Sequence, residues 1–175
     1  MSNKHTDKKH VFINGTIYDL THLNDFIYKF ETDKNIFNIF VYFSCHCFSD
    51  EKLKYNQNLK FSCCNSKNLS ELRGFCIHRY NDSLKIKEHI IDMVNKGRVY
   101  FADKQNYMII PHTKYTIFFT LENKIESNSQ INLFIQSAYF KKDVIKDRDN
   151  NIPFDTLVQK IYNYEKIDFK SKKNR

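Results

Sequence analysis

The stretch from Tyr107 to Phe140 constrains the fold of this chain most, because it holds two long runs of β-branched and aromatic residues with a polar loop between them. The first run, KYTIFFTLE, starts at Lys114, and the second, INLFIQSAYF, covers residues 131–140. Runs of this composition and length are typical of buried β-strands. They predict two neighbouring central strands of a meander.

The second run also indicates where to look for a functional site. Strand side chains alternate between two faces, so one face is predicted to carry Ile131, Leu133, Ile135, Ser137 and Tyr139. The opposite face is predicted to carry Asn132, Phe134, Gln136, Ala138 and Phe140. Polar side chains therefore reach both faces near one end of the strand, and we expect a site at that end.

Further strands are predicted ahead of the meander. Asn14-Gly15 separates two short apolar runs within Val11–Leu20, which is a strong hairpin pattern. Phe26–Glu31 and Ile36–Ser44 predict two antiparallel strands joined by a polar turn. Arg98–Ala102 predicts one more strand, directly before the meander.

One main helix is predicted over Leu84–Lys96, where apolar residues recur at helical spacing. Asn81-Asp82-Ser83 offers a choice of N-caps, and Gly97 ends the helix. A short C-terminal helix is predicted over Asp155–Tyr164, and a long surface loop over Ser49–Ser70. The predicted fold class is therefore α+β: an antiparallel sheet meander with one main helix packed on it and a short C-terminal helix.

The length of 175 residues predicts one domain over residues 11–165. Residues 1–10 form a polar, basic and disordered N-terminus in this interpretation, and residues 166–175 a basic tail. No apolar run reaches the length of a membrane span, and the N-terminus lacks the apolar core of a signal peptide. We expect a cytoplasmic protein with no membrane partner, while the sequence leaves the oligomeric state open.

The charge balance points to an anionic partner. The chain has 28 Lys and Arg residues against 20 Asp and Glu, a formal net charge of +8. Nucleic acid is the partner that fits this excess best. A generally soluble basic protein without a nucleic-acid partner is the alternative.

The five cysteines predict free thiols, because an odd number with adjacent members is a poor disulfide framework. A zinc site is the alternative, and its possible ligands are Cys45, Cys47, Cys63, Cys64, Cys76 and His78. Their spacing differs from that of structural zinc sites, which use pairs of ligands two to four residues apart on a turn. We therefore expect no metal and no other cofactor, although the sequence does not settle the zinc question.

A second group of residues contains the functional groups that metal-independent RNA cleavage needs. Such cleavage requires a base for the 2′-hydroxyl proton, a cation for the phosphate and an acid for the departing 5′-oxygen. His46 suits the base or acid, Arg79 the phosphate clamp, and Ser137 or Tyr139 the proton source. Each has a structural alternative, since most single histidines and strand tyrosines serve packing.

Other basic and polar residues are candidates for contact with a nucleic acid. These are Arg73, Tyr80, Ser83, Arg98, Lys114, Lys141 and Lys142. Ser83 also has the alternative role of a helix N-cap.

Four segments, YDLTHL, SCHCF, RGFCIHRYNDS and INLFIQSAYF, resemble an uncharacterised bacterial family with HCF, RYxxS and LFxQSAY elements. The polar positions that match this pattern are His46, Arg79, Tyr80, Ser83, Ser137 and Tyr139. More distantly, the order of a helix followed by a meander that ends in Ser-Ala-Tyr is similar to the barnase, EndoU, colicin and RelE-like ribonuclease toxins. That resemblance implies a sheet that carries basic, His, Tyr or Ser residues for RNA cleavage without metal.

Two functional hypotheses follow. The first is a metal-independent endoribonuclease, acting as a toxin or in stress or phage defence, with RNA as substrate and a cognate antitoxin or protein inhibitor as a possible partner. The second is a non-enzymatic basic module that binds nucleic acid or protein in the same settings. Convergence of His46, Arg79 and Tyr139 in the folded chain would favour the first.

Overall fold

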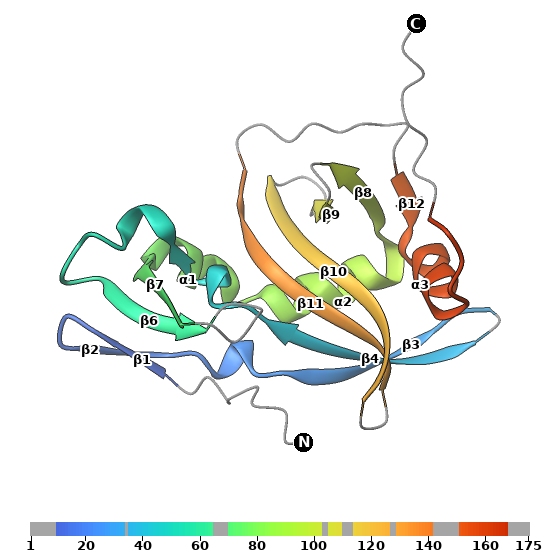
Figure 1. The fold of residues 1–175 in the computed structure, drawn as a ribbon, viewed down its shortest axis with the longest axis horizontal. Helices are drawn as coiled ribbons and strands as arrows, with labels where there is room; N and C mark the ends of the chain where they lie inside the picture. The colour runs from blue at the N-terminus through green and yellow to red at the C-terminus, as the bar shows by residue number, and fades with distance from the viewer. Residues whose placement is uncertain are drawn as a thin grey trace, which may run out of the picture.

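A seven-stranded mixed sheet forms the centre of the molecule (Figure 1). The computed structural model describes residues 10–33, 35–64, 70–102, 105–109, 114–126, 129–141 and 151–167. The strands in spatial order are β12 (Asn151–Pro153), β8 (Arg98–Ala102), β9 (Gln105–Ile109), β10 (Tyr115–Glu126), β11 (Ser129–Phe140), β4 (Ile36–Phe43) and β3 (Phe26–Glu31). The α+β fold class predicted from the sequence is confirmed.

The predicted meander is confirmed, since β8, β9, β10 and β11 pair antiparallel in chain order. β10 and β11 each have 12 residues and lie at the centre of the sheet. Their inner faces are fully buried at residues such as Ile117, Phe119 and Leu133. The two apolar runs thus form the central strands that their composition predicts.

One pairing departs from an all-antiparallel sheet. β3 and β4 pair antiparallel as predicted, but β4 then lies parallel to β11, with Ile39 opposite Ile131 and Phe43 opposite Ile135. A parallel pair needs a long crossover connection. Here residues 44–128, between the end of β4 and the start of β11, provide that crossover, and they include the first two helices.

Three α-helices accompany the sheets in the described part of the chain, where the sequence predicted two. The predicted main helix is α2 (Ile86–Lys96), and the predicted C-terminal helix is α3 (Phe154–Tyr162). The helix missed from the sequence is α1 (Ile77–Ser83), which contacts β11. Ser83 therefore ends α1, and its predicted role as an N-cap of the main helix is wrong.

The prediction of a loop over Ser49–Ser70 is also wrong in large part, because this segment contributes strands to a second sheet. β5 (Ser49–Asp50), β7 (Ser70–Phe75) and β6 (Lys60–Cys64) form this three-stranded antiparallel sheet. Two short 3₁₀ helices lie between β4 and β6 in the chain: η2 (Cys45–Cys47) and η3 (Glu51–Leu53). η3 packs so closely on β7 that a Cβ atom added at Gly74 would lie 2.3 Å from Leu53 Cβ, so only glycine fits there.

A hairpin of β1 (His10–Ile13) and β2 (Thr16–Asp19) begins the described chain, as the Asn14-Gly15 pattern predicts. Both turn residues have positive φ, 46° and 80° respectively, as a tight hairpin turn requires. The 3₁₀ helix η1 (Thr21–Leu23) then leads into β3. Among the described residues, no helix is long and apolar enough to cross a membrane.

A β-bulge changes the predicted faces of β11. Phe119 pairs with Ile135 but Phe118 pairs with Ser137, so Gln136 is an extra residue in this strand. After the bulge Ala138 is fully buried in the core, while Ser137 and Tyr139 are half-buried. The prediction that Ser137 and Tyr139 share a face with Ile131, Leu133 and Ile135 is therefore wrong, because a bulge reverses the alternation beyond it.

Candidate functional site

The candidate site lies where the second sheet and α1 meet the C-terminal end of β11. His46 lies in η2, three residues after the end of β4. This agrees with the prediction that His46 stands at a strand end. The hydroxyl of Ser44 caps η2 by accepting a hydrogen bond from the His46 backbone N–H at 3.2 Å. The imidazole is consequently held on a short, capped turn rather than on a long loop.

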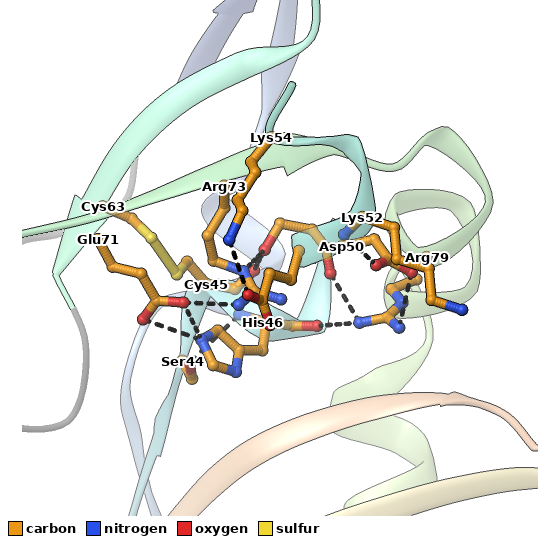
Figure 2. Close-up of polar contacts among 12 residues, drawn as sticks. Ser44, Cys45, His46, Asp50, Lys52, Lys54, Cys63, Glu71, Arg73 and Arg79 are labelled. Carbon is orange, nitrogen blue, oxygen red and sulfur yellow. Dashed lines mark hydrogen bonds and ion pairs between the residues drawn. A yellow bond between two sulfur atoms is a disulfide. The ribbon is translucent and has the colours of Figure 1, made fainter. Parts of the chain in front are cut away.

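The His46 imidazole faces a carboxylate on β7. Its Nε2 lies 3.2 Å from Oε1 and 3.3 Å from Oε2 of Glu71. Figure 2 draws both contacts as dashed lines. Arg73 donates to the same Glu71 Oε1 at 2.6 Å and to Ser49 Oγ at 2.7 Å. Ser49 Oγ in turn donates to the carbonyl of Cys45 at 2.7 Å. We call His46, Glu71 and Arg73 the imidazole cluster.

The electrostatics of this cluster keep His46 neutral near neutral pH. Burial lowers the pKa of His46 below its ordinary value of 6.5, and the charge of Arg73 lowers it further, while Glu71 opposes both. Burial raises the pKa of the Glu71 carboxyl, but hydrogen bonds from Arg73 and His46 outweigh burial, and the net pKa is lowered. A neutral imidazole that donates from Nε2 to Glu71 has Nδ1 as its acceptor. His46 can therefore accept a proton at Nδ1.

Arg79, on α1, is bound to the other side of the same segment. Its Nη1 donates to the Ser49 carbonyl at 2.7 Å and lies 3.4 Å from the His46 carbonyl, and its Nη2 lies 3.1 Å from Asp50 Oδ2. Figure 2 shows its guanidinium turned toward these backbone oxygens and Asp50, and the His46 imidazole turned toward Glu71. Arg79 thus joins α1 to the residues that follow η2.

Arg79 also begins a row in which two aromatic rings lie between two cations. Its Cζ lies 4.5 Å from the centroid of the Tyr139 ring. The Tyr139 ring stacks on Phe118 at 5.6 Å, and Lys141 Nζ lies 5.4 Å from the Phe118 centroid. We call Arg79, Tyr139, Phe118 and Lys141 the cation–aromatic row. It exists because the bulge at Gln136 turns Tyr139 away from the core.

The structure brings some of the predicted site residues together. The backbone of His46, the side chain of Arg79 and the ring of Tyr139 adjoin, although none of the three lines the pocket described below. Lys141 belongs to the row, and the carbonyl of Lys114 accepts the Lys141 N–H at 3.0 Å, so the two lysines flank the same strand ends.

Other predicted residues lie apart from this site or are committed elsewhere. Ser137 is half-buried opposite Phe118, and Arg98 is exposed on β8, near the other edge of the sheet, where it bonds Asn151. Lys142 lies outside the described residues. Tyr80 is half-buried against Tyr18 and His22.

Arg73 and Ser83 have internal roles in place of the predicted contact with nucleic acid. Arg73 is 5% exposed and Ser83 is fully buried. Ser83 Oγ donates to the Tyr80 carbonyl at 2.7 Å, so His22 Nε2, at 2.8 Å, is the donor to Ser83. Because their polar atoms are buried and bonded within the protein, neither side chain is accessible to an RNA strand.

A pocket of about 340 Å³ lies between the β1–β2 hairpin, η3 and the start of α1. Tyr18, Phe75 and Leu53 are among its lining residues, whereas His46 and Arg79 are not. The two side chains that are candidates for catalysis, His46 and Arg79, therefore lie outside this pocket.

The expectation of free thiols throughout is wrong at two positions, because Cys45 and Cys63 are joined by a disulfide. Their thiols are thereby removed from the proposed zinc ligands. Cys47 and Cys76 are not joined in a disulfide, and Cys47 is buried. Within the described ranges, no three His, Cys, Asp or Glu side chains gather as a metal site.

Sequence reasoning missed Glu71, Ser49, Asp50 and Phe118. Glu71 is the most informative omission, since it stands two residues before Arg73 and so shares its face of β7. Recognising SELRGF as a strand would have placed that carboxylate beside Arg73. Its contact with His46 depends on how η2 packs and has no local sequence pattern.

Comparison with known proteins identifies the family. The YjaZ family model matches residues 9–162. The chain belongs to the YjaZ family. Membership agrees with the resemblance to an uncharacterised bacterial family, and nothing in the match bears on a relationship to ribonuclease toxins. No curated protein and no solved structure matches the chain.

We expect this YjaZ-family protein to lose stability when the pH falls from about 7.5 to about 5.5. Burial is the main cause that lowers the pKa of both His22 and His46 in the folded protein. The imidazoles of the unfolded chain take up protons near pH 6.5, whereas those of the folded protein take them up only at lower pH. Protonation therefore favours the unfolded chain. The contribution of the two neutral imidazoles to the free energy of unfolding is complete above pH 6.5 and is lost as the pH falls toward the pKa of the folded protein.

Urea unfolding at the two pH values measures this difference. A His22→Gln variant should show a smaller loss between them than the wild type, because one of the two groups is removed. Equal stability of the wild type at both pH values would contradict the prediction.

Proposed function

We propose that this protein is a metal-independent endoribonuclease in which the cation–aromatic row binds RNA and His46 transfers the proton. The observation that carries the proposal is the His46–Glu71 contact, at 3.2 Å, next to an arginine stacked on Tyr139. A carboxylate that orients an imidazole is a common device for general base catalysis. The net charge of +8 is consistent with a polyanionic substrate.

In this proposal His46 Nδ1 takes the proton of a ribose 2′-hydroxyl, and the 2′-oxygen attacks the adjacent phosphorus. The bond from phosphorus to the 5′-oxygen breaks, a 2′,3′-cyclic phosphate forms, and the Tyr139 hydroxyl supplies a proton to the departing oxygen. Glu71 fixes the imidazole through Nε2 and stabilises its charged form. The positive charge of Arg79, which also acts on His46, stabilises the phosphate.

The row would supply affinity. Tyr139 is half-buried and is an aromatic ring of the kind that stacks on bases, whereas Phe118, 8% exposed, supports it from beneath, and Lys141 adds a positive charge beside them. Lys114, exposed at the same strand end, extends the positive surface. RNA binding of this kind depends strongly on salt.

A specific observation favours a second candidate, an RNA-binding module without cleavage. Both terminal nitrogens of Arg79 already bond Ser49, His46 and Asp50. A guanidinium with this many internal acceptors has few donors left for a reacting phosphate. The positive charge of Arg79 would then attract RNA without donating hydrogen bonds to the phosphate in the transition state.

The deciding experiment incubates the purified full-length protein with total cellular RNA and with transfer RNA in EDTA. Discrete fragments with 2′,3′-cyclic phosphate ends are the expected result. Intact RNA with salt-sensitive binding would support the second candidate instead. If the protein neither cleaves nor binds RNA, both candidates are overturned. A protein partner would then be sought.

A Tyr139→Leu variant is expected to bind single-stranded RNA roughly 5- to 150-fold more weakly, since stacking of one base contributes about 1–3 kcal/mol. Gel-shift or fluorescence titration at fixed salt measures the loss. Tyr162→Leu, on α3, is the matched control and should bind as the wild type does, because Tyr162 packs on Phe37 away from the row. Equal loss in both variants would argue against a role for the row.

A further inference from the structure

We propose that the Cys45–Cys63 disulfide is a thiol-exchange site, and that its reduction by a small thiol loosens η2 and alters the surroundings of His46. The bond joins η2 to β6 across a sequence separation of 18 residues. This inference goes beyond the proposed action on RNA and does not depend on it, because every measurement that tests it is made without RNA.

Strand register places the disulfide beside the imidazole cluster. Cys63 lies opposite Glu71 in the β6–β7 ladder, and directly opposed residues of antiparallel strands project on the same face. Cys45 directly precedes His46, whose imidazole contacts Glu71. The S–S bond and the imidazole–carboxylate contact are therefore two adjacent links between η2 and this ladder, as Figure 2 shows.

Other bonds hold both ends of η2 when the disulfide is open. The Ser44 N–H donates to the Ile135 carbonyl at 2.9 Å, and the Cys76 N–H donates to the Phe48 carbonyl at 3.0 Å. These bonds attach η2 to β11 on one side and to the start of α1 on the other. Reduction should consequently loosen Cys45 and His46 locally without detaching the segment.

Exposure decides which sulfur a small thiol attacks. Cys63 is half-buried, whereas Cys45 is 2% exposed. The attacking thiolate forms a bond to Cys63 Sγ, the S–S bond breaks, and Cys45 leaves as a thiolate that then takes a proton. A second small thiol attacks the mixed disulfide and frees Cys63. The protein disulfide is reduced by two electrons, and two small thiols are oxidised to one disulfide.

The change should be visible at His46. Burial is the first cause of its lowered pKa, with the charges of Arg73 and Arg79 acting in the same direction and Glu71 in the opposite one. Loosening η2 admits water to the imidazole while leaving these charged residues in the chain. The pKa of His46 should therefore rise toward its ordinary value on reduction.

The test compares the full-length protein before and after incubation with glutathione. Alkylation followed by mass spectrometry should find Cys45 and Cys63 blocked before treatment and reactive afterwards, with a trapped glutathione adduct at Cys63. NMR titration of the imidazole should give a higher pKa for His46 in the reduced protein. A Cys76→Ala variant, which removes a free half-buried thiol, should respond as the wild type does.

A Cys63→Ser variant should show the reduced form's His46 titration without any added thiol. If this variant does not fold, the comparison of oxidised and reduced wild type decides alone. An identical His46 titration in the two wild-type states would overturn the proposal. So would a disulfide that resists glutathione at millimolar concentration, or an adduct on Cys45 instead of Cys63.

Discussion

RNA cleavage in EDTA is expected to fall at least about 100-fold when His46 is replaced by glutamine, since a positioned general base contributes roughly 100- to 10,000-fold. The glutamine amide can still donate to Glu71, so the change removes the ionisable nitrogen while keeping a hydrogen-bonding partner for the carboxylate. The rate of fragment formation from transfer RNA measures the loss.

His89→Gln is the matched control for this result. His89 is a half-buried histidine on α2, packed against Tyr115, and it has no part in the imidazole cluster. The control should cleave RNA at the wild-type rate. Undiminished cleavage by His46→Gln would remove His46 from the mechanism, and equal losses in the two variants would indicate a general effect on folding.

The largest expected effect on stability comes from Phe75→Ala, which should lower the free energy of unfolding by roughly 3–5 kcal/mol. Phe75 is 2% exposed, and its ring lies 4.4 Å from that of Tyr18, 5.5 Å from Tyr80 and 6.4 Å from Phe48. It thereby connects the β1–β2 hairpin, α1 and the residue after η2. Removing the ring leaves a cavity at this junction, which surrounding groups fill only in part.

Urea unfolding of Phe75→Ala beside Leu72→Ala tests this expectation. Leu72 stands on the same strand but is 49% exposed. Its truncation should change the stability by about 0.5 kcal/mol or less. Similar losses in the two variants would show that the aromatic junction does not stabilise the fold.

Several elements of this protein could be predicted because their information is local. Strand and helix periodicities reside in successive side chains, so Phe26–Glu31 and the stripe of α2 were placed correctly. The turn at Asn14-Gly15 follows from the backbone freedom of these two residue types. Local patterns failed at the short strand β6 and at α1, in which polar residues outnumber apolar ones, because tertiary packing decides the structure of both segments.

The sequence by itself determined the fold class, the central meander and the chemical groups from which a site could be built. Only the tertiary structure decided which of those groups meet. The bulge at Gln136 turns Tyr139 toward Arg79, and the packing of η2 on β7 pairs His46 with Glu71 and Cys45 with Cys63. The physical reason is that strand register and contacts between distant segments depend on the free energy of the whole packed chain, whereas a periodicity records only neighbouring residues.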